Sequence, residues 1–210
     1  MYRGSWIANN LEGLGICRNP DGTFYEGEWE NMQPHGKGHR TFPDQSFYKG
    51  NFKYGMKSGN GTLNCPDGSI YKGQFEDNQI NGRGLYTWPH GIQYEGMWVD
   101  NKKQGQGVLK WLDGSREYSG DFMDDERHGH GTYIWENGTK SYRGYWRNGL
   151  KDGIGYVRDE FDYSERKGLW FCGKLVKWMP MEDEDEGQDG ESLKSADIRD
   201  WEGPSGNFNE

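Results

Sequence analysis

The sequence predicts an all-β fold: an elongated single-layer antiparallel β-meander of about seven to eight stacked hairpin repeats, curved and twisted. Three observations predict it: an aromatic-x-Gly-x-aromatic motif at fixed spacing, alternation with a period of two, and turn residues between the copies. The spacings between successive copies are 23, 23, 23, 23, 24 and 24 residues, and the copies begin at Tyr2, Tyr25, Tyr48, Tyr71, Tyr94, Tyr118 and Tyr142. A unit this small cannot bury its own apolar face, so neighbouring units must stabilise it.

The first strand of each unit is short and one-sided. In the unit that begins at Tyr25, residues 25–29 read Tyr-Glu-Gly-Glu-Trp, and a strand places the Tyr, Gly and Trp on one face and the two Glu on the other. The aromatic face is therefore expected to form the core, and the polar face is expected to meet solvent.

A second strand follows a five-residue linker and begins at a pair of glycines, such as Gly36 and Gly38. By parity, both glycines share a face with the apolar residues two and four positions after the pair. Glycine within a strand often marks the close approach of another group. We therefore expect the rings of one strand to lie over the glycines of its neighbours.

Both kinds of connection carry turn residues. The linker has one common position that suits a left-handed backbone, with Met32 as the exception, and it is occupied elsewhere by Asn9, Gly55, Asn78, Asn101, Asp125 and Gly149. The connection between units carries Pro-Asp-Gly, Pro-His-Gly, Asp-Gly or Asn-Gly, at residues 19–22, 65–68, 88–91, 112–114 and 136–138. Because both connections are turns, consecutive strands pair as a meander. A partial eighth unit at Arg166 keeps only the first-strand pattern and is expected to cap the array.

Charge divides the chain into a repeat array at 1–180 and an acidic tail at 181–210. Of the 25 basic and 34 acidic residues, 2 and 11 lie in the tail, so residues 1–180 hold 23 of each. The tail is poor in apolar residues and is expected to be disordered. A neutral array argues against nucleic acid as a partner, and an acidic tail is repelled by anionic lipid.

The cysteines and the hydropathy favour a cytoplasmic location. The three cysteines, Cys17, Cys65 and Cys172, are odd in number and their spacing suggests no set of disulfides, as expected in a reducing compartment. No stretch approaches the roughly 20 apolar residues of a membrane span.

Motifs that resemble catalytic or ligand sites are better explained by structure, so we expect no catalytic, cofactor-binding or metal-binding residues. The Gly-x-Gly pairs lack the following helix that a phosphate loop needs. His35 and His128 occupy a slot that is polar in other units, and His35 with His39 lacks the helix that makes their spacing useful for a metal. His128 and His130 can offer two ligands on one strand face, but a structural role is the better explanation. Carboxylates on an open sheet have no closed pocket to separate their pKa values.

The aromatic face is the candidate binding surface. A single layer has no second sheet to cover this face, and a large exposed apolar surface normally marks a partner site. Most of the rings are expected to hold the sheet together, and some to contact a peptide or helix as well. The partner-binding candidates are Tyr86, Trp88, Trp111, Tyr133, Trp135, Trp98, Phe122 and Trp146.

Taken together, Tyr-x-Gly-x-Trp, His-Gly-x-Gly and Asp-Gly at a 23-residue period resemble MORN (membrane occupation and recognition nexus) repeats over about residues 2–175. Arrays of this family occur in junctional membrane proteins, ciliary radial spoke heads, parasite cytoskeletal baskets, and as accessory segments of phosphatidylinositol phosphate kinases and a SET-domain lysine methyltransferase. In those enzymes, catalysis lies outside the repeats. The resemblance implies a scaffold in a ciliary, axonemal or other cytoskeletal assembly.

Two other functions stay open at this point. The family's name suggests a peripheral membrane module that binds phosphoinositides, for which Lys49, Lys53, Lys72, Lys102, Lys103, Arg143 and Arg147 offer a basic patch. The chain is alternatively a regulatory segment of a larger enzyme. The unpaired edge strands also open a route to a homodimer joined end to end.

Overall fold

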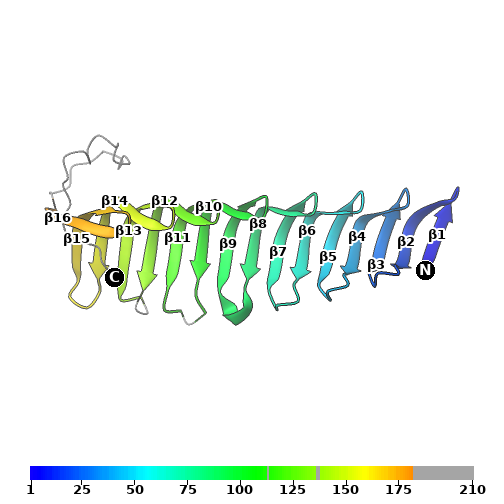
Figure 1. Ribbon diagram of the computed structural model, residues 1–210, viewed down its shortest axis with the longest axis horizontal. Coiled ribbons are helices and arrows are strands. Elements are labelled where there is room, and N and C mark those ends of the chain that lie inside the picture. Colours follow the sequence, from blue (N-terminus) through cyan, green and yellow to red (C-terminus); the bar gives the residue numbers. More distant parts are fainter. Residues whose placement is uncertain (113, 136–137, 182–210) are drawn as a thin grey trace, which may run out of the picture.

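The computed structural model describes residues 1–112, 114–135 and 138–181, and it shows one antiparallel sheet of 16 strands whose spatial order follows the sequence (Figure 1). The acidic tail predicted to be disordered lies outside the described residues, apart from Met181. The strands are β1 (Tyr2–Ile7), β2 (Asn10–Arg18), β3 (Phe24–Glu30), β4 (Gln33–Thr41), β5 (Phe47–Lys53), β6 (Met56–Asn64), β7 (Ile70–Glu76), β8 (Gln79–Thr87), β9 (Gln93–Val99), β10 (Lys102–Lys110), β11 (Glu117–Met123), β12 (Glu126–Trp135), β13 (Lys140–Arg147), β14 (Leu150–Asp159), β15 (Ser164–Phe171) and β16 (Lys174–Met179). The predicted single-layer meander is confirmed.

The two strands of each unit are joined by a tight two-residue turn, not by the expected five-residue linker. In the second unit only Asn31 and Met32 form the turn, with φ of 48° and 63°, and the other linker residues extend β3 and β4. Two successive positive φ values match the type I′ turn, whose twist suits antiparallel strands. The expected left-handed position is confirmed, and Met32 adopts the same conformation despite its side chain.

These turns form a ladder along one rim of the sheet. The amide of Asn78 donates to the carbonyl of Lys57 at 3.0 Å, and its Oδ1 accepts from the amide of Lys57 at 2.9 Å. Asn101 makes the same two bonds with Ile80, at 3.0 and 2.8 Å. Where Asn or Asp stands at this position, its side chain therefore connects its own unit to the preceding one, in addition to closing the turn.

The opposite rim carries the turns between units. The amide of Gly22 donates to the carbonyl of Asn19 at 3.1 Å, and Gly68 and Cys65 repeat this bond at 3.0 Å. A short 3₁₀ turn, η1 (Pro89–Gly91), replaces the Pro-Asp-Gly turn where His90 stands. The turns predicted at 112–114 and 136–138 include residues outside the described ranges.

The core is a single row of rings laid over glycines. Tyr48, Tyr71 and Tyr94 have no exposed surface, and an added Cβ at Gly50 would lie 2.5 Å from the hydroxyl oxygen of Tyr48. Each tyrosine hydroxyl also donates to a carbonyl of its own strand, as in Tyr48 to Asn51 at 2.9 Å. The expectation that rings and glycines are packed against one another is confirmed.

The first glycine of each pair does not share the aromatic face, contrary to the parity expectation. Gly36 has φ of 61°, and the β3–β4 register shifts between Gly27 and Trp29, which marks a β-bulge. The bulge turns this glycine to the other face, where an added Cβ would meet the carboxylate of Glu28. Only the second glycine, such as Gly38, lies under the tyrosine ring.

The eighth unit is a complete hairpin, although its sequence retains only the first-strand pattern. Strand β16 pairs with β15 from Phe171↔Lys174 to Lys167↔Met179. It lacks the Gly-x-Gly pair, and its Trp178 packs edge to face on Trp170 with ring centroids 5.9 Å apart. The array therefore ends on a strand that covers the last core ring.

Within the described part of the chain, no helix is long and apolar enough to cross a membrane. All three cysteines are free, as the sequence predicts.

Candidate functional site

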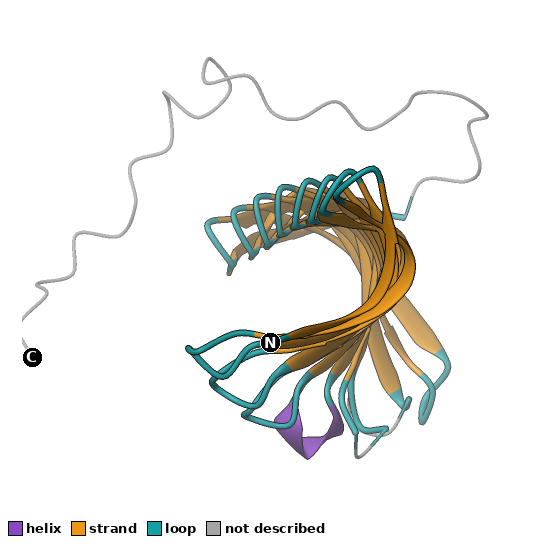
Figure 2. Ribbon diagram, turned by 90° about the vertical axis from the view of Figure 1, so that its right-hand side faces the viewer, coloured by secondary structure: helices purple, strands orange, loops and turns teal. Residues whose placement is uncertain are grey.

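The aromatic face is the concave face of the sheet, and we call it the aromatic groove. Tyr48 and Phe52 lie four residues apart on β5, yet their ring centroids are only 5.1 Å apart. Residues four apart in a straight strand are separated by about 13 Å. The sheet is C-shaped when viewed along its length (Figure 2). Lys57 at one rim lies 5.8 Å from the ring of Phe42 at the other rim, so the strands bend toward the rings.

Burial separates the eight candidate residues into two groups. Trp98, Phe122 and Trp146 on the first strands are each only 3% exposed and belong to the core. The other five lie on or just beyond the second strands and are half-buried, and they are Tyr86, Trp88, Trp111, Tyr133 and Trp135. The half-buried group supplies the ring surface that a partner can reach.

The accessible rings form two clusters. Tyr86 contacts Trp88 at 4.5 Å and Trp98 at 5.8 Å between ring centroids. Further along the groove, Tyr133 is stacked with Trp135 at 5.8 Å and meets Trp111 edge to face at 6.1 Å. The structure thus brings the candidates together in two groups, one near the middle of the array and one toward its C-terminal end.

A row of cations faces these rings, and the sequence analysis missed it. Lys57, Lys103 and Lys151 are the second residues of β6, β10 and β14, and each reaches a ring on the opposite rim of the preceding unit. The ammonium groups lie 5.8 Å from the ring centroid of Phe42, 5.5 Å from that of Trp88 and 5.0 Å from that of Trp135, respectively. Such cation–π contacts favour a charged group over a ring face. The recurrence of Lys or Arg at the second position after the two-residue turn is the sequence signal for this row.

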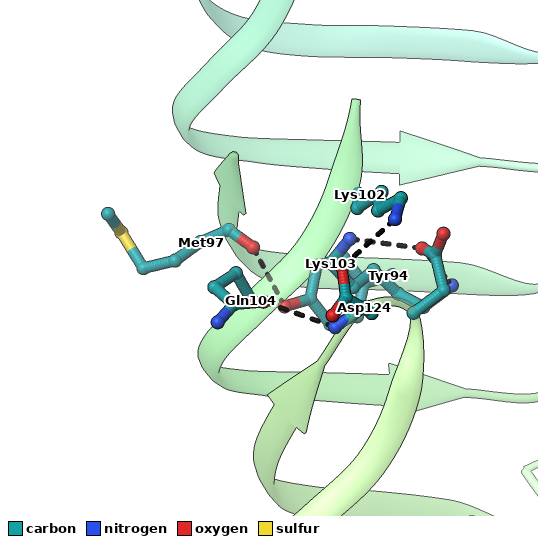
Figure 3. A network of polar contacts seen from close by, with 7 residues as sticks. Tyr94, Met97, Lys102, Lys103, Gln104 and Asp124 are labelled. Atoms are coloured by element: carbon teal, nitrogen blue, oxygen red, sulfur yellow. Dashed lines mark hydrogen bonds and ion pairs between the residues drawn. The ribbon is translucent and has the colours of Figure 1, made fainter. Parts of the chain in front are cut away.

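One of these cations is neutralised by an ion pair. The Nζ of Lys103 lies 3.0 Å from Asp125, whose Oδ1 also accepts from the amide of Lys103 at 3.0 Å. Figure 3 shows the surrounding polar network, in which Lys102 pairs with Asp124 and Tyr94 donates to the carbonyl of Met97. Hydrogen bonds and the charge of Lys103 lower the pKa of Asp125 despite the opposing effect of burial.

Arg127 and Lys151 have no such carboxylate within the described residues. The Arg127 guanidinium donates to the carbonyl of Gly149 at 2.7 Å and lies 4.4 Å from the ring centroid of Trp146. Burial lowers the pKa of the Lys151 ammonium, and the nearby charge of Arg127 lowers it further. Two like charges are therefore held close together without a counter-charge.

These cations line a hollow of about 510 Å³ in the groove. Its walls come from both rims of the sheet, and its lining residues are Arg116, Arg127, Tyr133, Trp135, Trp146, Gly149, Leu150, Lys151 and Gly173. Cations and rings surround the hollow, and no acidic side chain among the described residues lines it.

On the convex face, polar side chains accept hydrogen bonds from the backbone at the bulges. Gln74 accepts a hydrogen bond from the amide of Arg83 at 2.8 Å, and Asp121 accepts one from the amide of His130 at 3.0 Å. Each bond holds the residue that follows the bulge glycine. A second hollow of about 470 Å³ lies on this face, and it mixes Lys72 and Arg83 with Glu95.

No cluster of three or more potential metal ligands occurs among the described residues. His35 pairs with Glu30 at 3.0 Å, His39 packs edge to face on Phe47, and His130 packs on Tyr145. These three histidines thus contact carboxylate or ring neighbours.

Comparison with known proteins identifies the family. The model of the MORN repeat matches seven segments, at residues 2–24, 25–47, 48–70, 71–92, 94–116, 118–140 and 142–156. No curated protein sequence matches the chain. Among solved structures, the TCP domain of Drosophila melanogaster SAS-4 (dCPAP), solved in complex with a proline-rich motif of Ana2 (dSTIL), is similar with a TM-score of 0.49 and 11% identity, over 80% of this chain and 90% of that chain. The seven matches, in register with the tyrosines that open the hairpins, show that the chain belongs to the MORN repeat family.

Proposed function

We propose that this chain is a non-catalytic scaffold for protein–protein interactions and that its aromatic groove binds a peptide or helix of a partner. One observation carries the proposal: the half-buried rings Trp88, Trp111 and Trp135 line a concave face that no second layer covers in the described part of the chain. Tryptophan, tyrosine and arginine are the residues most enriched at the energetic centres of protein interfaces.

The groove suits a segment that inserts side chains. The ring clusters around Tyr86 and Tyr133 lie on separate units, so an extended peptide or a helix that follows the array can contact both. The rings are held in place by contacts with core residues, such as Tyr133 against Trp146 at 6.1 Å. Pre-ordered side chains lose little conformational entropy when a partner binds.

Membership of the MORN family supports the setting that we propose, a ciliary or axonemal assembly of the radial-spoke type or another cytoskeletal structure in the cytoplasm. The absence of catalysis is part of the proposal. It is supported by convex carboxylates such as Asp121, which is engaged in backbone hydrogen bonds at a bulge.

Binding to phosphoinositide membranes is the weaker alternative. Four of the seven cations of the suggested basic patch are paired with carboxylates, and these are Lys102, Lys103, Arg143 and Arg147. Pairing reduces the positive charge available to a lipid surface. Co-sedimentation with liposomes that contain phosphoinositides, at low and high salt, tests this alternative, because binding through a basic patch must weaken with salt.

Site-specific photocrosslinking tests the groove directly. A photoreactive amino acid is placed at Trp111 or Trp135 in the groove and, as a control, at Met97 on the convex face. We expect the same partner to be crosslinked from both groove positions and not from the convex one. The double variant Trp111→Ala/Trp135→Ala should lose this partner, while Met97→Ala/Ile154→Ala should retain it. An unchanged partner set in a folded groove variant would overturn the proposal.

Within the described residues, the outer edges of β1 and β16 pair with no other strand, so their backbone groups can pair with another chain. A homodimer joined at these edges is part of the proposal, and light scattering of the purified chain tests it: a monomer at all concentrations would exclude it.

A further inference from the structure

We propose that the cationic end of the aromatic groove binds a run of carboxylates and that its occupant is the chain's own acidic segment, residues 182–191. This inference rests on the proposed function, because it places an internal competitor in the groove that a partner uses.

The site is the hollow lined by Arg116, Arg127 and Lys151, with Tyr133 and Trp135 beside them. Its volume of about 510 Å³ accommodates several side chains of a bound segment. The exposed Arg116 lies over Trp111 at 5.0 Å and the half-buried Lys151 lies over Trp135 at 5.0 Å, so both cations are held against ring faces of the groove.

The cations retain unused hydrogen-bonding capacity. A guanidinium has five N–H donors and an ammonium three. The described contacts of the Arg127 guanidinium use one of them, the 2.7 Å bond to Gly149, and those of the Lys151 ammonium are the ring faces of Trp135 and Tyr142. Carboxylates are the groups that satisfy such donors best, because the hydrogen bonds are charge-assisted.

The comparison with Lys103 shows what is missing at this site. Asp125, at the second residue of its turn, forms the ion pair with Lys103. The residue at the equivalent position of the next turn, beside Arg127, is Gly149, which has no carboxylate. The next unit has Gly173 there, beside Lys151. Two successive units thus keep the cation and lack the carboxylate that pairs with it, so a carboxylate from another segment can take that place.

The chain holds one segment with the complementary charge. Residues 182–191 read Glu-Asp-Glu-Asp-Glu-Gly-Gln-Asp-Gly-Glu, with seven carboxylates and no cation, whereas residues 1–180 are balanced. Only Pro180 and Met181 separate the segment from the end of β16. Four strand spacings, about 19 Å, separate β16 from β12, and ten extended residues span about 33 Å. The segment is therefore long enough to reach the site.

Binding of a labelled synthetic peptide of residues 182–191 tests the inference. The protein is the full chain in two forms, the natural one and a tail-neutral one in which the seven carboxylates of 182–191 are replaced by Asn or Gln. We expect the peptide to bind the tail-neutral chain at least ten-fold more tightly, because its own segment no longer competes. Binding should weaken as salt rises from about 50 to about 500 mM.

Matched variants of the tail-neutral chain localise the site. Arg116→Gln/Lys151→Gln should weaken peptide binding at least ten-fold, while Lys37→Gln/Lys72→Gln on the convex face should change it less than two-fold. Circular dichroism verifies that each variant is folded. The inference is overturned if the peptide does not bind the tail-neutral chain, if it binds both forms equally, or if the two variant pairs behave alike.

The assay contains no partner protein, so its failure leaves the photocrosslinking test of the proposed function unaffected. If phosphate-bearing vesicles displace the peptide but the natural tail has no effect on its binding, the site belongs to a lipid headgroup and the inference is also overturned.

Discussion

The ring of Tyr48 on β5 packs against the backbone of Gly61 on β6. In the β5–β6 ladder, Tyr48 is paired with Leu63 and Gly61 with Gly50, so the ring reaches across to the neighbouring pair. An added Cβ at Gly61 would overlap the ring. The tyrosine has no exposed surface, so it has no space into which it can retreat.

Gly61→Ala is therefore expected to destabilise the sheet by about 3 kcal/mol, the upper range for overpacking a close-fitting core. Gly68→Ala is the control, because Gly68 has φ of 90° but nothing lies within 4 Å of an added Cβ. Its cost should be only the backbone strain, about 1 kcal/mol. Urea unfolding followed by tryptophan fluorescence measures both, and equal losses would show that the close approach of Tyr48 does not limit position 61.

Met32→Asn is expected to stabilise the protein by about 1 kcal/mol. Asn tolerates the left-handed backbone better than Met, and Asn78 shows that its side chain can accept a hydrogen bond from the preceding unit. The equivalent donor for residue 32 is the amide of Leu11, whose carbonyl already accepts from the amide of Met32 at 3.3 Å. Thermal unfolding measures the change.

The reciprocal variant Asn78→Met should be destabilising by a similar or larger amount, because it removes the bond to the amide of Lys57. A stabilising Asn78→Met, or a neutral Met32→Asn, would contradict the role assigned to the turn ladder.

Trp146→Phe should cost about 1 kcal/mol, whereas Trp146→Ala should cost about 3 to 5 kcal/mol. Phe122 occupies the same position one unit earlier, so a smaller ring fits the repeat. The Phe variant loses the bond from the indole Nε1 to the carbonyl of Gly131, at 3.1 Å. Urea unfolding of both variants is the measurement, and equal losses would show that the indole bond dominates over ring burial.

Alkaline pH is expected to unfold the array cooperatively. Burial raises the pKa of Tyr48 and that of Tyr71 to about 12, with an opposing effect of their hydrogen bonds to backbone carbonyls. An unfolded tyrosine has a pKa of about 10. The neutral rings therefore contribute stability that is fully present below about pH 10 and is lost as pH rises through about 12. Burial also holds the pKa values of Tyr94, Tyr118 and Tyr142 well above their usual range.

Tyrosinate absorbance and circular dichroism, recorded together during the titration, test this expectation. The absorbance of the buried rings should appear in the same pH interval in which the strand signal is lost. Ionisation of all tyrosines with the strand signal intact would contradict it.

Much of the fold could be predicted because one rule, parity along a strand, governs most positions. It placed Tyr48 over glycines and Trp98 on the aromatic face, although Trp98 was named as a partner-binding candidate and is a core residue. The rule fails at Gly36, because a bulge there inserts a residue and reverses the face that follows. It also missed β16, whose residues Lys174–Met179 pair with β15 through the backbone without the glycines of the other second strands.

The groove was predicted only in part. The position of Trp111 and Trp135 on the aromatic face follows from parity, and their partial exposure follows from the lack of a second layer. Lys57 and Lys151 were not identified, because a charged residue in a strand is ordinarily assigned to the solvent face. Strand bending brings the two rims together, and long side chains can then cross to rings on the other side. Curvature of this degree follows from contacts between units, which parity within one strand does not describe.

Since every strand pairs only with its immediate neighbours in the sequence, the sheet can be assembled in the order in which the ribosome makes it. Each new hairpin that leaves the ribosome can pair at once with the folded edge of the preceding unit, and it needs no segment from later in the sequence. Folding then needs only short loops to close, a feature associated with fast folding. We expect a nascent chain stalled at a unit boundary to be a shorter, already ordered version of the finished protein, with one exposed edge ready for the next unit.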